Sequence, residues 1–151
     1  MQYTFDITLK NRKILLSLLD ELTLDQLNKI PEGFRNNIFW NIKHVVVTQQ
    51  LLVYGLSELP LLVTATDVDE FRKGTVPFKD ATEKDVIVLK KQLLLTLEQT
   101  IKDFTSQRFR TYKEYTVTTK TTLTNVKEAL EFNNFHEGIH LGYILALKRV
   151  I

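Results

Sequence analysis

Apolar residues recur at the spacing of an α-helix along most of this chain, and that periodicity constrains the fold more than any other feature. The longest stripe keeps a spacing of three or four positions and comprises Val86, Leu89, Leu93, Leu94, Leu97, Ile101 and Phe104. Thr82 and Asp85 precede it in the arrangement of a capping box, which marks where a helix begins. The pattern therefore predicts one long amphipathic helix with a single buried face.

Two further segments in the first third of the chain carry helix signals. Apolar periodicity predicts a first helix over residues 5–19, and a capping box at Thr23 predicts a short connector helix after it. A second long helix is expected to begin after Asn36 or Asn37 and to run to about Tyr54, where a nearby glycine and proline mark its end.

The remaining segments complete a bundle. Asn125 predicts the start of a last long helix. Residues 60–80 have poor periodicity, which predicts a long crossover loop, and residues 115–123 are rich in Thr and Val, which predicts a loop or an edge hairpin. The sequence therefore predicts an all-α fold, a four-helix bundle with a long crossover connection, formed by residues 1–151 as one domain.

Composition narrows the range of functions. The hydrophobic fraction of 44% and the charged fraction of 25% match a soluble globular protein, and the formal net charge of +2 comes from Lys and Arg scattered among Asp and Glu. Neither a nucleic-acid partner nor a membrane partner is expected, because no basic stripe and no apolar run of membrane-spanning length is present. The absence of cysteine excludes thiolate ligands, and with no export signal at the start it favours the cytoplasm.

Three histidines stand out against this background. His136 and His140 are four positions apart on the last predicted helix, so both side chains leave the same face and can converge on one ion. His44, the remaining histidine, lies near the middle of another long helix, on an unusually polar stripe that comprises Asn37, Asn41, His44, Thr48 and Leu51. A metal site between two helices would account for both placements.

The last helix also carries a polar stripe between apolar flanks, formed by Asn133, His136, His140 and Tyr143. Burying imidazoles costs free energy unless partners satisfy them, and a metal ion would satisfy several at once. Three neutral imidazoles leave coordination positions open, as a catalytic ion requires, and zinc, nickel and iron(II) all fit such ligands. The alternative is that the three histidines are hydrogen-bonded or exposed, and that the pair four apart arose by chance.

The segment from His136 to His140 also satisfies the H-E-x-x-H pattern of zinc proteases, in which Glu137 would be the general base. Such proteases usually take a third ligand from downstream, and no residue after His140 is His, Asp or Glu. The protease interpretation is therefore disfavoured. Glu137 remains a candidate catalytic residue, a carboxylate beside the ligands, or an ordinary charged neighbour.

Residues 37–44 and 133–143 together resemble the DinB-like, or YfiT-like, superfamily of metalloenzymes. The first segment is similar to the helix with that family's first ligand, and the second is similar to its H-x-x-x-H segment. The resemblance implies a four-helix bundle in which His44, His136 and His140 hold one divalent metal ion. It also implies a thiol S-transferase with a low-molecular-weight thiol cosubstrate, a chemistry that needs no protein cysteine.

Three functions remain open at this point. The first is a thiol-dependent S-transferase that acts on small electrophiles. The second is a metal-dependent hydrolase of small amides or esters, with Glu137, Tyr143 or an Asp of the crossover moving protons. The third is a non-catalytic, metal-stabilised bundle.

Other residues are expected to support the site or the assembly. Trp40, Asn41 and Asn133, with Tyr143, lie one turn or one position from a ligand, although core packing would also explain Trp40 and Tyr143. Basic side chains near the mouth of the bundle could meet an anionic thiol, and the candidates are Arg35, Lys43 and Arg72. The apolar flank of the last helix indicates a possible homodimer and comprises Phe132, Phe135, Leu141, Leu145 and Leu147.

Overall fold

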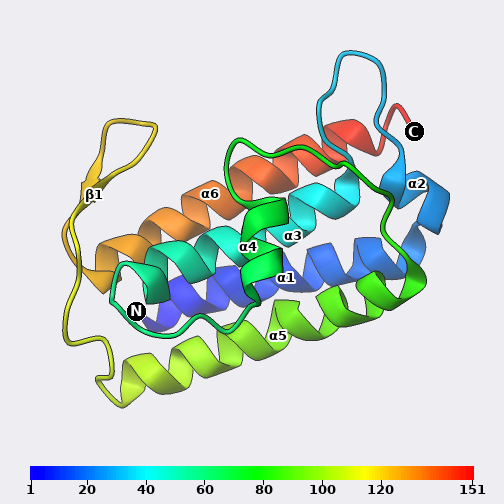
Figure 1. The fold of residues 1–151 in the computed structure, drawn as a ribbon. Helices are drawn as coiled ribbons and strands as arrows, with labels where there is room; N and C mark the ends of the chain where they lie inside the picture. Colours follow the sequence, from blue (N-terminus) through cyan, green and yellow to red (C-terminus); the bar gives the residue numbers. More distant parts are fainter.

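The computed structural model describes residues 1–151 and is an all-α bundle, as predicted (Figure 1). Its four long helices are α1 (Gln2–Glu21), α3 (Ile38–Gln50), α5 (Glu83–Thr105) and α6 (Val126–Leu147). The chain of α3 continues into one turn of π-helix, η1 (Leu51–Gly55), so the second long helical segment ends where the sequence indicated.

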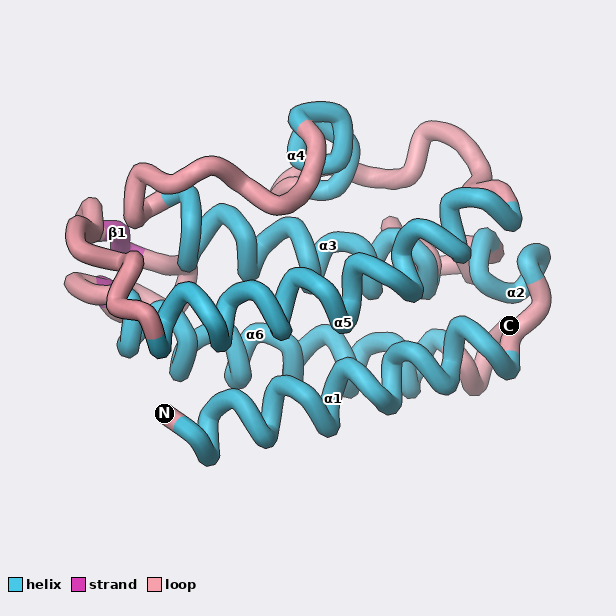
Figure 2. The backbone as a smooth tube through the Cα atoms, turned by 90° about the horizontal axis from the view of Figure 1, so that it is seen from below, coloured by secondary structure: helices cyan, strands magenta, loops and turns pink.

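The helices form two parallel pairs. Figure 1 shows α1 and α6 running in one direction and α3 and α5 in the other. This arrangement requires a long connection from α3 to α5, because two parallel neighbours cannot be joined by a tight turn. Figure 2 shows this connection on the outside of α3, where it carries the short helix α4 (Ala65–Phe71).

The predicted helix starts are confirmed at the level of hydrogen bonds. Thr23 forms a capping box at α2 (Leu24–Asn28), and Thr82 forms one at α5. The side chain of Asn37, the second of the two candidate residues, caps α3. The side-chain oxygen of Asn125 accepts a hydrogen bond from the backbone amide of Glu128 at 3.1 Å and so caps α6. Each side chain satisfies a backbone amide that would otherwise lack a partner at the first turn.

The expectation of a loop over residues 60–80 was wrong for the part that forms α4. Thr64 and Asp67 make a third capping box there. Only Val68 and Phe71 of α4 pack against the apolar core and neither is fully buried, so the segment is too short and too sparsely apolar for a helix to be found by periodicity. An ion pair between Lys43 and Asp67, at 2.8 Å, attaches α4 to α3.

The Thr-rich segment forms a small antiparallel hairpin, which was one of its two predicted forms. Its strands are β1 (Tyr115–Thr116) and β2 (Thr122–Leu123), and Tyr115 pairs with Leu123. Leu123 and Val117 are buried in the apolar cluster at this end of the bundle. The hairpin is thereby fixed beside the first turns of α6.

Two apolar clusters fill the bundle, one toward each end. The larger contains Leu15, Ile42, Leu89 and Ile144, and the smaller contains residues such as Phe5. Polar side chains from all four long helices are buried between them. None of the helices combines the length and the apolar character that crossing a bilayer requires.

Candidate metal centre

The antiparallel packing of α3 against α6 brings the three histidines together. The ring centroids of His44 and His140 are 4.7 Å apart, those of His136 and His140 are 4.6 Å apart, and those of His44 and His136 are 5.2 Å apart. One nitrogen from each ring lies within 4.8 Å of the others, so the three side chains form a group that could hold a metal ion. The spacing of four residues on α6 and the packing of α3 produce this group together.

Hydrogen bonding fixes the ring of His44. Its Nδ1 lies 2.6 Å from the carbonyl oxygen of Phe71, at the end of α4. A carbonyl can only accept, so Nδ1 carries the proton and Nε2 keeps its lone pair. The hydroxyl of Thr48 lies 3.2 Å from Nε2, one turn along the helix. His44 is therefore a neutral ligand whose unprotonated Nε2 is the nitrogen that can coordinate a metal ion.

His140 is oriented in the same way by an amide. The Nδ2 of Asn41 donates to the carbonyl of Asn37 at 2.8 Å, which assigns Oδ1 as the acceptor that faces His140. The Nδ1 of His140 lies 2.9 Å from this oxygen and donates to it, which leaves Nε2 unprotonated. Such a bond to the second ring nitrogen is what orients metal-binding imidazoles in proteins.

Burial keeps the histidines neutral. It lowers the pKa of His136 to about 3, with contributions from His140 and His44, and it lowers the pKa of His140 to about 4, with a contribution from His44. Burial also lowers the pKa of His44, although the bond to the Phe71 carbonyl opposes the shift. At neutral pH all three rings therefore have a lone pair to offer.

His136 differs from the other two in its partners. Its Nδ1 is buried and has no hydrogen-bond partner within the chain. A buried polar atom without a partner costs free energy, and such atoms in native proteins call for an explanation. The residues present fit a metal ion on two grounds: an unsatisfied imidazole nitrogen, and three convergent neutral rings.

The crossover supports the site from outside α3. Trp40 stacks on the ring of His44 with centroids 4.6 Å apart and planes 11° from parallel. Its Nε1 donates to the carbonyl of Glu70 and to the hydroxyl of Thr75, both at 3.3 Å. The end of α4 therefore holds both the first histidine and the ring packed against it.

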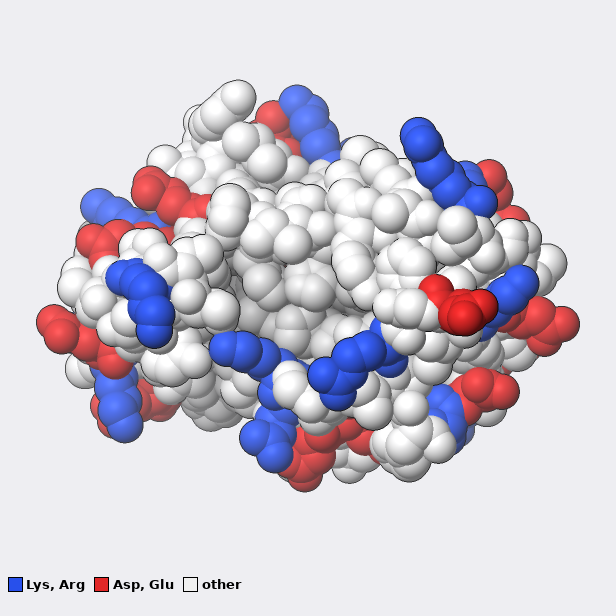
Figure 3. Space-filling view, turned by 90° about the horizontal axis from the view of Figure 1, so that it is seen from above, with Lys and Arg blue, Asp and Glu red and all other residues white.

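The histidines line a cavity of about 780 Å³ between the bundle and its two long connections. Figure 3 shows a hollow lined mainly by uncharged atoms, with Lys and Arg side chains at its edge. The apolar lining comes from α3, η1, the crossover, the hairpin and α6, and includes Leu51, Leu52, Leu56, Val76, Val117 and Phe132. Arg35 and Lys73 add positive charge, and no Asp or Glu lines the cavity.

Comparison with known families agrees with this geometry. The model of the DinB superfamily matches residues 8–144, which include all three histidines, the whole of α3 and all but the last turn of α6. The chain belongs to the DinB superfamily. A search of curated proteins found no match. The resemblance that the two histidine segments suggested is thereby confirmed.

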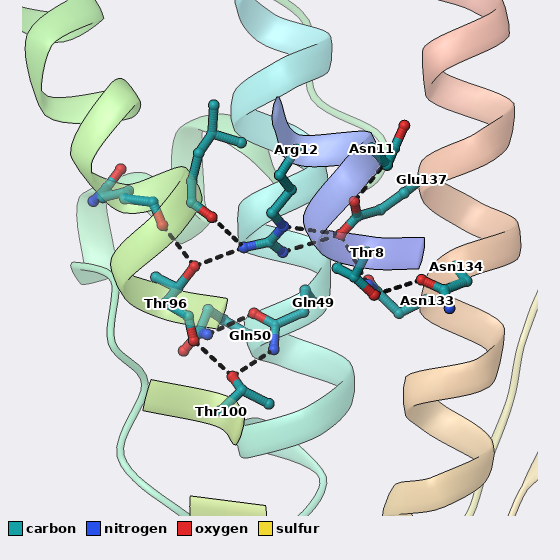
Figure 4. Close-up of polar contacts among 12 residues, drawn as sticks. Thr8, Asn11, Arg12, Gln49, Gln50, Thr96, Thr100, Asn133, Asn134 and Glu137 are labelled. Atoms are coloured by element: carbon teal, nitrogen blue, oxygen red, sulfur yellow. Dashed lines mark hydrogen bonds and ion pairs between the residues drawn. The ribbon is translucent and has the colours of Figure 1, made fainter. Parts of the chain in front are cut away.

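In this DinB superfamily protein Glu137 lies on the side of α6 that faces α1 (Figure 4), and it does not line the cavity that the histidines share. Its Oε1 accepts from the Arg12 guanidinium at 3.0 Å and from Asn133 at 2.8 Å, and its Oε2 accepts from Asn11 at 2.9 Å. Arg12 also donates to the hydroxyl of Thr96 at 2.8 Å. The carboxylate is therefore part of a buried polar network between the helices.

The structure brings two of the other expected residues to the histidines and leaves two apart. Asn41 bonds His140 and Trp40 stacks on His44. Asn133 bonds Glu137 instead, and Tyr143 packs edge-on against Phe34, with ring centroids 5.5 Å apart. Neither Asn133 nor Tyr143 lines the cavity.

Of the basic candidates, Arg35 lines the cavity and Arg72 does not. Lys43 is paired with Asp67. Sequence reasoning missed Lys73 and the carbonyl of Phe71, because their positions depend on how the crossover folds back over α3. The capping box at Thr64 was the one available signal that this segment is ordered.

Proposed function

We propose that this protein is a metal-dependent enzyme that joins a low-molecular-weight thiol to a small electrophile, with His44, His136 and His140 as the metal ligands. The observation that carries the proposal is a group of three neutral imidazoles in the wall of an open cavity that no carboxylate lines. A divalent cation held there would lower the pKa of a coordinated thiol and so supply a nucleophile at neutral pH. Zinc, nickel and iron are all compatible with imidazole ligands.

The chain itself prepares the ligands. The Phe71 carbonyl and Asn41 fix the tautomers of His44 and His140, so that Nε2 is the unprotonated nitrogen in each. Trp40 restricts the ring of His44 to one plane by stacking on it. Rings oriented in advance lose little conformational freedom on binding an ion, which favours affinity.

The cavity suits a largely apolar electrophile and an anionic cosubstrate. Leu52, Leu56 and Phe132 can cover a carbon skeleton, while Arg35 and Lys73 can bind a carboxylate of the thiol. In the reaction the thiol releases its S–H proton to water, the sulfur electron pair forms the new C–S bond, and the leaving group departs with the electrons of its former bond to carbon. The protein supplies the relative position of the two substrates, and it needs no cysteine.

A metal-dependent hydrolase of small amides or esters is the second candidate function. It needs a group that moves protons between water and the leaving group, for which Glu137, Tyr143 or an Asp of the crossover was considered. None of these lines the cavity, and both oxygens of Glu137 accept hydrogen bonds elsewhere. This placement favours the thiol reaction over hydrolysis.

Three further assignments accompany this function. We place the protein in the cytoplasm, where low-molecular-weight thiols stay reduced. We treat residues 1–151 as one domain, because both apolar clusters contain residues of α1, α5 and α6, together with α3 in one cluster and its continuation η1 in the other. We also propose a homodimer, since Phe135 and Leu145 remain exposed on α6, whereas Leu147 of the same predicted apolar flank is buried.

The test compares metal content and turnover. The metal content of protein purified without added metal is measured by elemental analysis. The same protein is then assayed with a chromogenic nitroaryl chloride as the electrophile, with and without thiol. We expect bound metal, and turnover that requires both the metal and the thiol. The double variant His136→Ala/His140→Ala should lose both.

Asn134→Ala is the matched control, because Asn134 lies on α6 but bonds Thr4 and Thr8 of α1. It should keep the metal and the activity. Equal metal content in the wild type and the double histidine variant would overturn the site. Turnover of an ester without thiol would favour the hydrolase, and metal binding that raises the melting temperature without any reaction would favour the non-catalytic bundle.

A further inference from the structure

A face of α6 outside the cavity carries exposed apolar side chains. Phe135 and Ile139 each keep 52% of their surface exposed, and Leu145 keeps 45%. These residues lie within three turns of one helix and form an exposed apolar strip. Large apolar residues clustered on one exposed helix face are typical of a surface that another protein covers.

Two glycines lie in the middle of this face. Gly138 and Gly142 have ordinary helical backbone angles, and a Cβ added to either would meet no atom within 4 Å. Glycine within a helix is unfavourable relative to alanine. Packing inside the chain therefore gives no reason for glycine at either position. Close approach of a helix from outside would give one, because glycine lets two helix backbones come near each other.

The sequence of the face is self-complementary when it is reversed. Its central positions are Glu131, Phe135, Gly138, Gly142, Leu145 and Arg149, all exposed, with successive spacings of four, three, four, three and four residues. This is the heptad spacing of a helix seam. Reversal about position 140 places Glu131 opposite Arg149, Phe135 opposite Leu145, and Gly138 opposite Gly142.

The helical path extends far enough to include the last of these residues. Lys148 has a right-handed helical backbone, and the amide of Arg149 donates to the carbonyl of Ala146 at 3.1 Å. Arg149 therefore stays near the same face, one turn beyond Leu145. It supplies a positive charge at one end of the strip, and Glu131 supplies a negative charge at the other.

We propose that this face binds a second copy of the same chain, with the two α6 helices packed antiparallel about a twofold axis near position 140. Each Glu131 then meets Arg149 of the other copy, the aromatic ring of Phe135 packs on Leu145, and the glycines meet at the crossing point. The pairing is isologous, as expected of a closed homodimer. It leaves the cavity accessible, because none of these six face residues lines the cavity.

The two charged residues allow a sharp test of the register. They are 18 positions apart, which is about 27 Å along a helix, so they cannot pair within one chain. We would measure the dimer dissociation constant by sedimentation equilibrium for the wild type, Glu131→Arg, Arg149→Glu and the double variant. Each single reversal sets like charges opposite each other twice per dimer and should weaken the dimer roughly tenfold.

The double variant should recover the wild-type dissociation constant, because it restores both pairs with their signs exchanged. Glu98→Arg, an exposed reversal on α5, is the matched control and should change nothing. A monomeric wild type would overturn the proposal. So would single reversals without effect, which place the interface elsewhere, and so would a double variant that stays weak, which rejects the register.

A change of bulk at the crossing point tests the close approach. Gly142→Leu should abolish the dimer, whereas circular dichroism should show the helical content unchanged, because the added side chain meets nothing inside the chain. Gly142→Ala is the smaller step and should weaken the dimer less. A dimer that tolerates leucine at this position would contradict the proposed crossing.

Discussion

His136 and Glu137 are neighbours in α6, yet the polar groups of their side chains differ in whether the chain supplies hydrogen-bond partners. The carboxylate of Glu137 faces α1 and accepts from Arg12, Asn11 and Asn133. The imidazole of His136 faces the cavity, and its Nδ1 has no partner in the chain. The first group is matched by the fold itself, whereas the second has a partner to gain from outside. This difference separates a structural network from a candidate binding site on a single helix.

The largest expected effect comes from removing Arg12, the charged partner of the Glu137 carboxylate. Arg12 and Glu137 expose 0% and 1% of their side chains, so Arg12→Met leaves a carboxylate buried without its counter-charge. Removing one partner of such a pair costs about 3 to 5 kcal/mol. We expect the free energy of unfolding, measured by urea titration, to fall by that amount.

The double variant Arg12→Met/Glu137→Leu is the control for this change, because it removes both charges. It should recover part of the lost stability, since an apolar pair of similar volume can replace a buried ion pair, whereas Asn11 and Asn133 lose their acceptor. It should also keep its metal, because Glu137 does not face the histidines. Loss of metal from a stably folded double variant would contradict the separation of the two sides.

The buried histidines on the cavity side of α6 should instead make the free energy of unfolding depend on pH. In the unfolded chain a histidine has a pKa near 6.5, whereas in the folded chain His136 has a pKa of about 3 and His140 of about 4. Below pH 6.5 the unfolded chain therefore binds more protons, and stability falls as the pH falls. At pH 5 each of these two rings should cost about 2 kcal/mol relative to pH 7.

Urea unfolding in the presence of a chelator at pH 7 and pH 5 measures this loss, which should total about 4 kcal/mol for the two rings. In His136→Ala/His140→Ala the same change of pH should cost much less, because only His44 is left to contribute. An equally steep pH dependence in that variant would show that other groups control the acid sensitivity.

Much of the fold, and the pairing of two of the histidines, could be predicted from the sequence. The bundle followed from apolar periodicity, and the helix starts followed from Thr23, Asn37, Thr82 and Asn125, because caps act over three or four residues. The pairing of His136 with His140 is equally local. These predictions depend on helix geometry alone, which the order of residues fixes directly.

The direction of Glu137 could not be predicted in the same way. It lies next to a histidine in the sequence, but one position along a helix rotates the side chain by about 100°. Which helix meets it there depends on the parallel pairing of α1 with α6. The fold of the crossover, and with it Phe71 and Lys73, depends on an ion pair and on caps instead of on apolar periodicity. Long-range partners of this kind are set by tertiary packing.

A smaller effect should test whether Asn41 of α3 orients His140 for metal binding. Asn41→Ala removes the acceptor that holds His140 in its tautomer, and the loss of such a partner typically lowers metal affinity by about 10-fold to 100-fold. Competition with a chromogenic chelator measures it. Asn134→Ala loses an amide of the same size on the α1 side of α6 and should leave the affinity unchanged. Equal losses in both variants would point to a general loosening of the bundle.

The smallest expected effect comes from the hydrogen bonds between Trp40 and the crossover. Trp40→Phe keeps an aromatic ring beside His44 but removes the Nε1 donor that reaches the Glu70 carbonyl and the Thr75 hydroxyl. A net hydrogen bond of this kind contributes about 1 kcal/mol, so the free energy of unfolding should fall by about that amount. Metal affinity should change less than in Asn41→Ala, because Phe71 still accepts from His44. A larger loss of affinity than of stability would instead make stacking on His44 the main contribution of Trp40, since phenylalanine offers a smaller ring.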